Sequence, residues 1–143
     1  MSSPIDQAYQ TMLEQHRALK DLLGRIDTAL RERSATMEQV GRMLGELGDK
    51  LVKHFALEES GGYFGEALLH APRLVSRAND LMAQHPKMAV EAKSIVPLGA
   101  SAEDWWAETA KRFEAFTKEL LLHEQREDRL LQEAYTNDIE AGD

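Results

Sequence analysis

The sequence predicts an all-α protein: a single domain over residues 1–143, folded as an antiparallel, up-down-up-down four-helix bundle. Four stretches of the chain carry apolar residues at alternating intervals of three and four, the pattern of a helix with one buried face. The connections between these stretches are short, so consecutive helices should run in opposite directions. With 143 residues, the chain is long enough to bury a hydrophobic core between them.

Composition and charge exclude several classes of function. The chain has 17 basic and 25 acidic residues, a formal charge of −8, and no basic run, which makes nucleic acid and anionic membrane surfaces poor partners. No apolar stretch approaches the roughly 20 residues that span a bilayer, and the N-terminal segment lacks the pattern of a signal peptide. Cysteine is absent, which excludes disulfides and thiolate metal sites. We therefore expect a cytoplasmic location.

The first helix should begin at Ser3-Pro4, with Ser3 as the N-cap and Pro4 in the first turn. Its predicted buried positions, which we call the seam of the helix, follow each other at intervals of four and three. One of them, His16, carries a metal-binding nitrogen. The seam comprises Ile5, Tyr9, Met12, His16, Leu19, Leu23, Ile26 and Leu30. Residues 31–34 form the first connection.

The second helix should begin with a capping box over residues 36–39. Its seam ends in two polar residues and comprises Val40, Leu44, Leu47, Leu51, His54 and Glu58. We expect this helix to continue through Gly61 and Gly62 to about Leu69, because it then extends as far beyond His54 as the next helix extends before His85. A helix break and a loop over residues 60–66 is the alternative, since a glycine pair usually ends a helix.

The third helix should open at Ala71-Pro72, and Pro86 predicts a kink because it removes one backbone donor. Its seam comprises Leu74, Ala78, Leu81, His85, Met88, Ala92 and Ile95. After a connection over residues 94–101, the fourth helix should open near Ser101, with Glu103 and Asp104 in its first turn. The fourth seam comprises Ala102, Trp106, Thr109, Phe113, Phe116, Leu120, His123, Glu127, Leu130 and Ala134.

Four of the five histidines fall on the seams, one on each helix, and two of them are followed four residues later by a seam glutamate. The fifth, His70, is expected to face solvent at a helix end. Residues four positions apart lie on the same side of a helix, so each glutamate points with its histidine. Because an unpaired glutamate on an apolar seam is costly, the expected partner is a metal ion. The six candidate ligands are His16, His54, Glu58, His85, His123 and Glu127.

The type and number of ligands narrow the choice of metal. Imidazole and carboxylate groups without sulfur suit iron, manganese or zinc, and six side chains are too many for one tetrahedral zinc ion. Two ions, each held by two histidines and joined by two bridging carboxylates, would use all six side chains.

Three acidic neighbours of these residues need separate interpretation. Asp128 stands five residues after His123 and competes with Glu127, but Asp128 lies off the seam, so we prefer Glu127. Glu59 and Glu124 also point off their seams. We interpret both as surface carboxylates, with a supporting role beside a metal ligand as the alternative.

The order His, His-x-x-x-Glu, His, His-x-x-x-Glu, together with the stretches HFALEES and LLLHEQRED, resembles the hemerythrin-like, or HHE cation-binding, family over almost the whole chain. The resemblance implies a four-helix bundle around a non-haem di-iron centre. It implies the six residues as ligands of two iron ions, both glutamates as bridges, and manganese or zinc as less favoured metals. Oxygen-carrying members have a further histidine on the third helix, where this chain has Leu81 and Ala89. The missing imidazole implies an open position on one iron.

The ligands and the resemblance together predict a protein that binds or reacts with a small molecule, namely dioxygen, peroxide or nitric oxide, in sensing, storage or detoxification. The open position favours redox reactivity or sensing over reversible oxygen carriage. Gly61 and Gly65 are the predicted gap through which the small molecule reaches the metal. The alternative function is an iron-responsive regulatory module without turnover. A metal-free interaction bundle is a third possible function, and the glutamates on the seams argue against it. The residues identify no protein partner and do not decide whether the protein is an enzyme.

Overall fold

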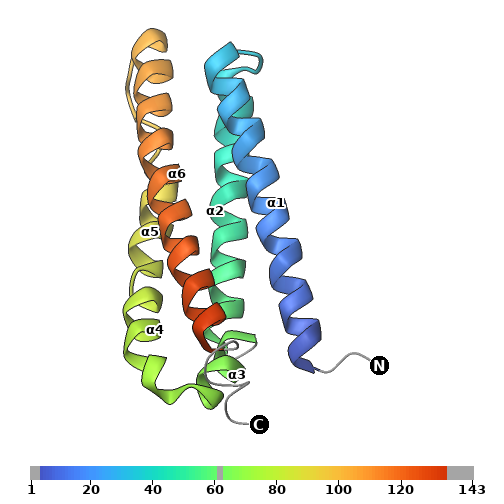
Figure 1. Cartoon of the computed structure of the whole chain (residues 1–143). Coiled ribbons are helices and arrows are strands. Elements are labelled where there is room, and N and C mark those ends of the chain that lie inside the picture. Colours follow the sequence, from blue (N-terminus) through green and yellow to red (C-terminus); the bar gives the residue numbers. More distant parts are fainter. Residues whose placement is uncertain (1–3, 61–62, 135–143) are drawn as a thin grey trace.

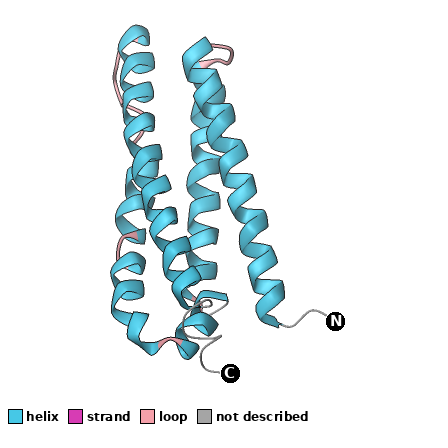
Figure 2. Ribbon diagram, in the orientation of Figure 1, coloured by secondary structure: helices cyan, strands magenta, loops and turns pink. Residues whose placement is uncertain are grey.

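The computed structural model describes residues 4–60 and 63–134, and every regular element within them is helical (Figure 1, Figure 2). The prediction of an all-α protein is confirmed. Figure 1 shows α1, α2 and α6 as long helices; α1 packs against α2 and α6, and the shorter α4 and α5 pack on the other side, α4 against α6 and α5 against α2 and α6. No described helix is both long and apolar enough to cross a membrane. In chain order the elements are α1 (Pro4–Glu32), α2 (Met37–Glu59), α3 (Tyr63–His70), the 3-10 helix η1 (Pro72–Leu74), α4 (Val75–Met82), α5 (His85–Lys93) and α6 (Ala102–Glu133).

Local capping explains where the long helices begin. α1 starts at Pro4 as predicted, and its expected N-cap, Ser3, lies outside the described residues. The Thr36 side chain accepts a hydrogen bond from Gln39 N at 3.1 Å, while Thr36 N donates to Gln39 Oε1 at 2.8 Å, so the predicted capping box of α2 is confirmed. Ser101 caps α6 by accepting from Asp104 N at 3.3 Å.

The second predicted helix is divided into two elements. α2 ends at Glu59, where Ser60 N closes the last turn by donating to Ala56 O at 3.0 Å, and α3 begins only at Tyr63. The prediction of one helix to Leu69 is therefore wrong, although Gly61 and Gly62 themselves lie outside the described residues. Two consecutive glycines carry a helix-propensity cost of about 1 kcal/mol each, which explains why a break is favoured at this place.

The third predicted helix is also divided, at the position of the expected kink. α4 ends at Met82, and α5 begins with His85 and Pro86. Pro86 has no N–H to donate to the carbonyl of Met82, and the chain tightens locally, with Gln84 N donating to Leu81 O at 3.1 Å. The predicted seam is nevertheless preserved across η1, α4, α5 and the residues that follow, since all seven of its members are buried.

The core consists of two apolar clusters, and the candidate ligands lie between them. The larger cluster is formed by α1, α2, α5 and α6, and the smaller one includes residues of α3, η1, α4 and the end of α6. Each helix passes from one cluster to the other at the position of its histidine, so the polar groups are enclosed on both sides. The flanking residues are Met12 and Leu19 on α1, Leu51 and Leu57 on α2, Leu81 and Met88 on α4 and α5, and Leu120 and Leu130 on α6.

Candidate metal centre

The structure brings all six predicted ligands together in the interior, in two adjacent groups. Five of the six are buried, and His16 is half-buried. Within each group the potential ligand atoms all lie within 4.8 Å of one another. The first group consists of Glu58, His85, His123 and Glu127, and the second of His16, His54 and an additional residue, Glu124.

An internal repeat relates the two histidine pairs, because each residue of one pair recurs 69 positions later in the other. His16 Nε2 lies 3.1 Å from His54 Nε2, and in the second pair His85 Nε2 lies 3.2 Å from His123 Nε2. The glutamates repeat as well. His54 Nε2 is 3.3 Å from Glu58 Oε1, and its counterpart His123 Nε2 is 3.3 Å from Glu127 Oε1. Sequence spacing and geometry therefore describe two nearly equivalent half-sites.

Glutamine side chains hold the outer nitrogens of two histidines. His54 Nδ1 lies 3.1 Å from Gln15 Oε1, and His123 Nδ1 lies 2.8 Å from Gln84 Oε1. Each glutamine directly precedes the other histidine of the same pair, so this contact follows the 69-residue repeat. Because an amide oxygen can only accept, both Nδ1 atoms donate, and in the neutral rings the lone pair is on Nε2.

A carboxylate fixes the ring of His85 in the same way. Its Nδ1 lies 3.3 Å from Glu59 Oε1, so the alternative interpretation of Glu59, as a carboxylate that supports a ligand, matches this contact. In the tautomers that donate from Nδ1, the Nε2 lone pairs of His85 and His123 consequently face each other across 3.2 Å. Two facing lone pairs repel unless a cation lies between them. Ligand atoms at right angles on an ion with bonds of about 2.1 Å are separated by about 3 Å, which matches this distance.

Several buried carboxylate oxygens also lack a partner that would stabilise them. Glu58 Oε1, both carboxylate oxygens of Glu127 and Oε1 of Glu124 are buried without a hydrogen-bond partner among the described residues. Burial, together with the neighbouring Glu127 carboxylate, raises the pKa of Glu58 strongly. Burial opposes the ionisation of Glu127, but the neighbouring Glu58, His123 and His85 side chains outweigh it and lower the pKa of Glu127. Buried oxygen atoms with no protein partner fit a bound cation.

Glu58 lies between the two half-sites. Its Oε1 is 3.3 Å from His54 Nε2 and 3.5 Å from His85 Nε2, which belong to different histidine pairs. Burial, and then repulsion from His16, lowers the pKa of His54 to about 4, so this imidazole is neutral at pH 7 and able to bind a metal through Nε2.

Glu124 is the residue that the sequence interpretation missed. It was assigned to the surface, yet its side chain is 7% exposed and lies with His16 and His54. Burial, reinforced by Glu127 and Asp128, raises the pKa of Glu124 to about 7. In the 69-residue repeat the counterpart of Glu124 is Phe55, whose ring stacks on His85 with centroids 4.0 Å apart and planes at 6°. The sequence feature that could have identified Glu124 is its position directly after the seam histidine His123.

Glu127 and Asp128, the two candidates for the carboxylate ligand on α6, have different environments. Glu127 is 2% exposed, whereas Asp128 is exposed. The burial pattern therefore favours Glu127, as the seam did. Burial lowers the pKa of His16 and the charge of Asp128 partly offsets that effect, so Asp128 acts on His16 from outside the cluster.

Two glycines were predicted to form the entry gap for the small molecule. Gly61 lies outside the described residues, and Gly65 lies on α3. The side chain of His70 also lies outside the described part of the chain.

The fold and the clustered side chains define an all-helical protein with a candidate metal site of histidine and glutamate. The model of the hemerythrin HHE cation-binding domain matches residues 7–135, and the chain belongs to this family. The family resemblance predicted from the two His-x-x-x-Glu motifs is thereby confirmed. No curated protein and no solved structure matched the chain.

Proposed function

We propose that the chain holds a non-haem di-iron centre at which a small molecule binds or reacts. The observation that carries the proposal is the pair of Nε2 atoms of His85 and His123, which face each other at 3.2 Å while their Nδ1 atoms are held by oxygen acceptors. The second pair, His16 and His54, supports a second ion with the same spacing. Carboxylate and imidazole ligands suit iron, with manganese or zinc less favoured.

The proposed division of ligands follows the two groups. His85 and His123 would bind one ion, His16, His54 and Glu124 the other, and Glu58 and Glu127 would join the two. Helices α1, α2 and α6, with η1, α4 and α5 as the interrupted third member, would form the antiparallel four-helix bundle that positions them. In such a centre the iron supplies electrons and an open position for dioxygen, peroxide or nitric oxide. The chain would supply the imidazole ligands, the bridging carboxylates and the apolar clusters that limit access of water.

Elemental analysis of protein from iron-replete cells tests this proposal directly. We expect about two iron ions per chain, and substantially fewer in His54→Ala and Glu127→Ala, because each change leaves the remaining ligands buried and unpaired. His70→Ala is the matched histidine control and should retain the parent's content. One zinc ion or no metal in the parent, or equal iron in all variants, would refute the assignment.

An iron-responsive module without turnover is a second candidate, and the unpartnered carboxylate oxygens favour it. Without a cation they destabilise the folded state, so metal binding and folding should be coupled. Circular dichroism during chelation separates the two candidates. A large loss of helicity indicates iron sensing, whereas retained helicity with an absorption band that responds to dioxygen or nitric oxide indicates chemistry at the metal.

A further inference from the structure

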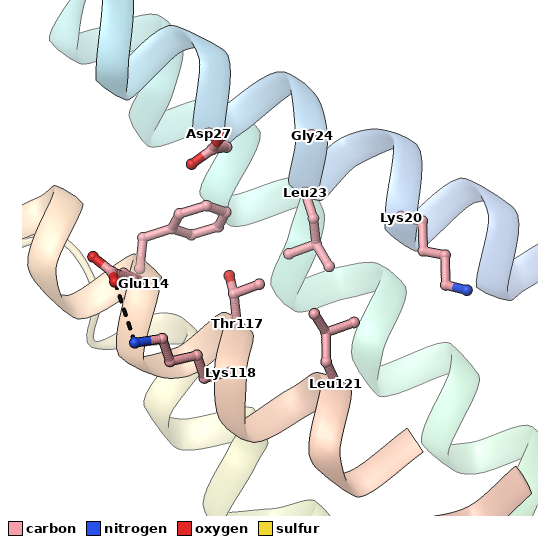
Figure 3. Close-up of a pocket in the computed structure, with 9 residues that line it drawn as sticks. Lys20, Leu23, Gly24, Asp27, Glu114, Thr117, Lys118 and Leu121 are labelled. Carbon is pink, nitrogen blue, oxygen red and sulfur yellow. Dashed lines mark ion pairs between the residues drawn. The ribbon is translucent and has the colours of Figure 1, made fainter. Parts of the chain in front are cut away.

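A groove of about 470 Å³ lies between α1 and α6, and none of its lining residues is a candidate metal ligand (Figure 3). Leu23 on α1, with Phe113 and Leu121 on α6, provides apolar wall. Gly24 leaves the α1 side open, because a Cβ atom added there would meet nothing within 4 Å. The volume is in the range of pockets that hold small organic molecules.

An unpartnered hydroxyl group lies within the groove. Thr117 Oγ1 is buried and has no hydrogen-bond partner among the described residues. In Figure 3 the Thr117 side chain extends from α6 toward α1, beside Leu23 and Leu121. Because Oγ1 is closed off from solvent, this hydroxyl offers no hydrogen bond to a molecule in the groove, and the wall at Thr117 acts as apolar surface.

The charges around the groove leave one cation available. Lys118 pairs with Glu114 at 3.3 Å, and Asp27 is paired with Arg31 on the same helix. Lys20 makes no ion pair with any residue that the structure describes, and it lies at one end of the groove's α1 wall. The groove therefore combines an apolar wall with a lysine outside any described ion pair, whose charge also acts on Glu124 and Asp128.

We propose that this groove binds a small amphipathic carboxylate, with its apolar body between α1 and α6 and its anionic group at Lys20. The α1 wall from Lys20 to Asp27 covers eight residues, a rise of about 10 Å along the helix. This length suits a medium-chain fatty acid or a substituted aromatic acid. The inference uses no metal ligand and does not rest on the proposed function of the metal centre.

Isothermal titration calorimetry of the metal-loaded protein with octanoate tests the site. The parent should bind one octanoate per chain and should bind octan-1-ol more weakly. Gly24→Leu fills the open side and should weaken octanoate binding at least about tenfold. Its control is Gly45→Leu, at an exposed glycine of α2 where an added Cβ also meets nothing within 4 Å, and this variant should bind as the parent does. Thermal unfolding verifies that both variants are folded.

The charge is tested separately with Lys20→Gln. This variant should bind octanoate about threefold to fivefold more weakly at low salt, as expected for an exposed ion pair, and octan-1-ol unchanged. Lys111→Gln, an exposed lysine of α6 outside the groove, is the matched control. Absence of saturable octanoate binding to the parent, or equal binding by Gly24→Leu and parent, would overturn the site. Equal octanoate binding by Lys20→Gln would overturn the ligand class.

Discussion

Replacing Glu124 with glutamine should stabilise the metal-free protein while weakening its hold on metal. Burial is the main cause that raises the pKa of Glu124 from 4.5 to about 7. At 1.36 kcal/mol per pKa unit, this difference corresponds to about 3 kcal/mol. The folded metal-free protein carries this cost when the carboxylate is ionised, and glutamine, which has nearly the same shape and no charge, removes it.

The sign of the effect fixes its pH dependence. The folded state binds the Glu124 proton more tightly than the unfolded chain does, so the carboxyl group imposes no cost below about pH 4.5. The cost grows as the pH rises from 4.5 to about 7 and is constant above that value. Glu124→Gln should therefore gain about 3 kcal/mol at pH 8, roughly 10 °C in Tm, and less than about 1 kcal/mol at pH 5.

Urea unfolding of chelator-treated protein, followed by circular dichroism at pH 5 and pH 8, measures this difference. Glu14→Gln is the control, because Glu14 is an exposed glutamate of α1 and its replacement should change neither value. In the iron-loaded protein the effect should reverse, since the His16 and His54 half-site loses an anionic ligand. No gain at pH 8, or an equal gain at both pH values, would show that Glu124 is not an ionised buried carboxylate.

Gln84→Ala should lower metal affinity about 10- to 100-fold, because Gln84 Oε1 holds the His123 ring through Nδ1. Gln10→Ala, at an exposed position of α1, is the control and should leave the affinity unchanged. Chelator competition measures both affinities, and equal values would contradict this role of Gln84. Thr36→Ala should cost about 1 kcal/mol in urea unfolding without loss of metal, and an unchanged unfolding free energy would mean that the cap adds nothing. Phe55→Ala should cost about 3–5 kcal/mol, because the ring is buried and stacked; a loss below 1 kcal/mol would argue against that packing.

The six clustered histidines and glutamates could be predicted from spacing because a polar residue on an apolar seam is conspicuous. Burying an ionisable group without a partner is costly, so its recurrence at seam positions of four helices pointed to a common partner. The seam positions of α2 and of η1, α4 and α5 are all buried. What spacing did not provide was the distance between helices, and hence the near-contact of Nε2 atoms such as those of His85 and His123.

Glu124 was missed because a seam describes one line, whereas α6 packs against α1 on one side and against α4 and α5 on another. The residue after His123 is rotated by about 100°, and it reaches the group that contains His16. The same difference appears at the start of α6, where Trp105 is buried and Trp106, the predicted seam residue, is only partly buried. Burial beside a seam depends on neighbours that periodicity alone does not reveal.

The break after α2 was misjudged for a different reason. The expected continuous helix rested on matching its length to an unbroken third helix, but Pro86 divides the third helix into separate pieces. Once that element is interrupted, the length comparison loses its force. Local chemistry, namely the glycines at positions 61 and 62 after Ser60, was then the better guide.

One difference between the half-sites that the 69-residue repeat reveals lies at Phe55 and Glu124. The histidine pairs agree within 0.1 Å in their Nε2 separations, 3.1 and 3.2 Å, so the ligands themselves do not distinguish the two positions. Phe55 and Glu124 do. Glu124 adds negative charge beside His16 and His54, which favours an ion of higher charge, whereas Phe55 covers His85 with an apolar ring that limits water. Under the proposed function, in which Glu58 and Glu127 join both ions, we therefore expect an uncharged diatomic molecule to bind in the half-site that lacks Glu124, beside Phe55.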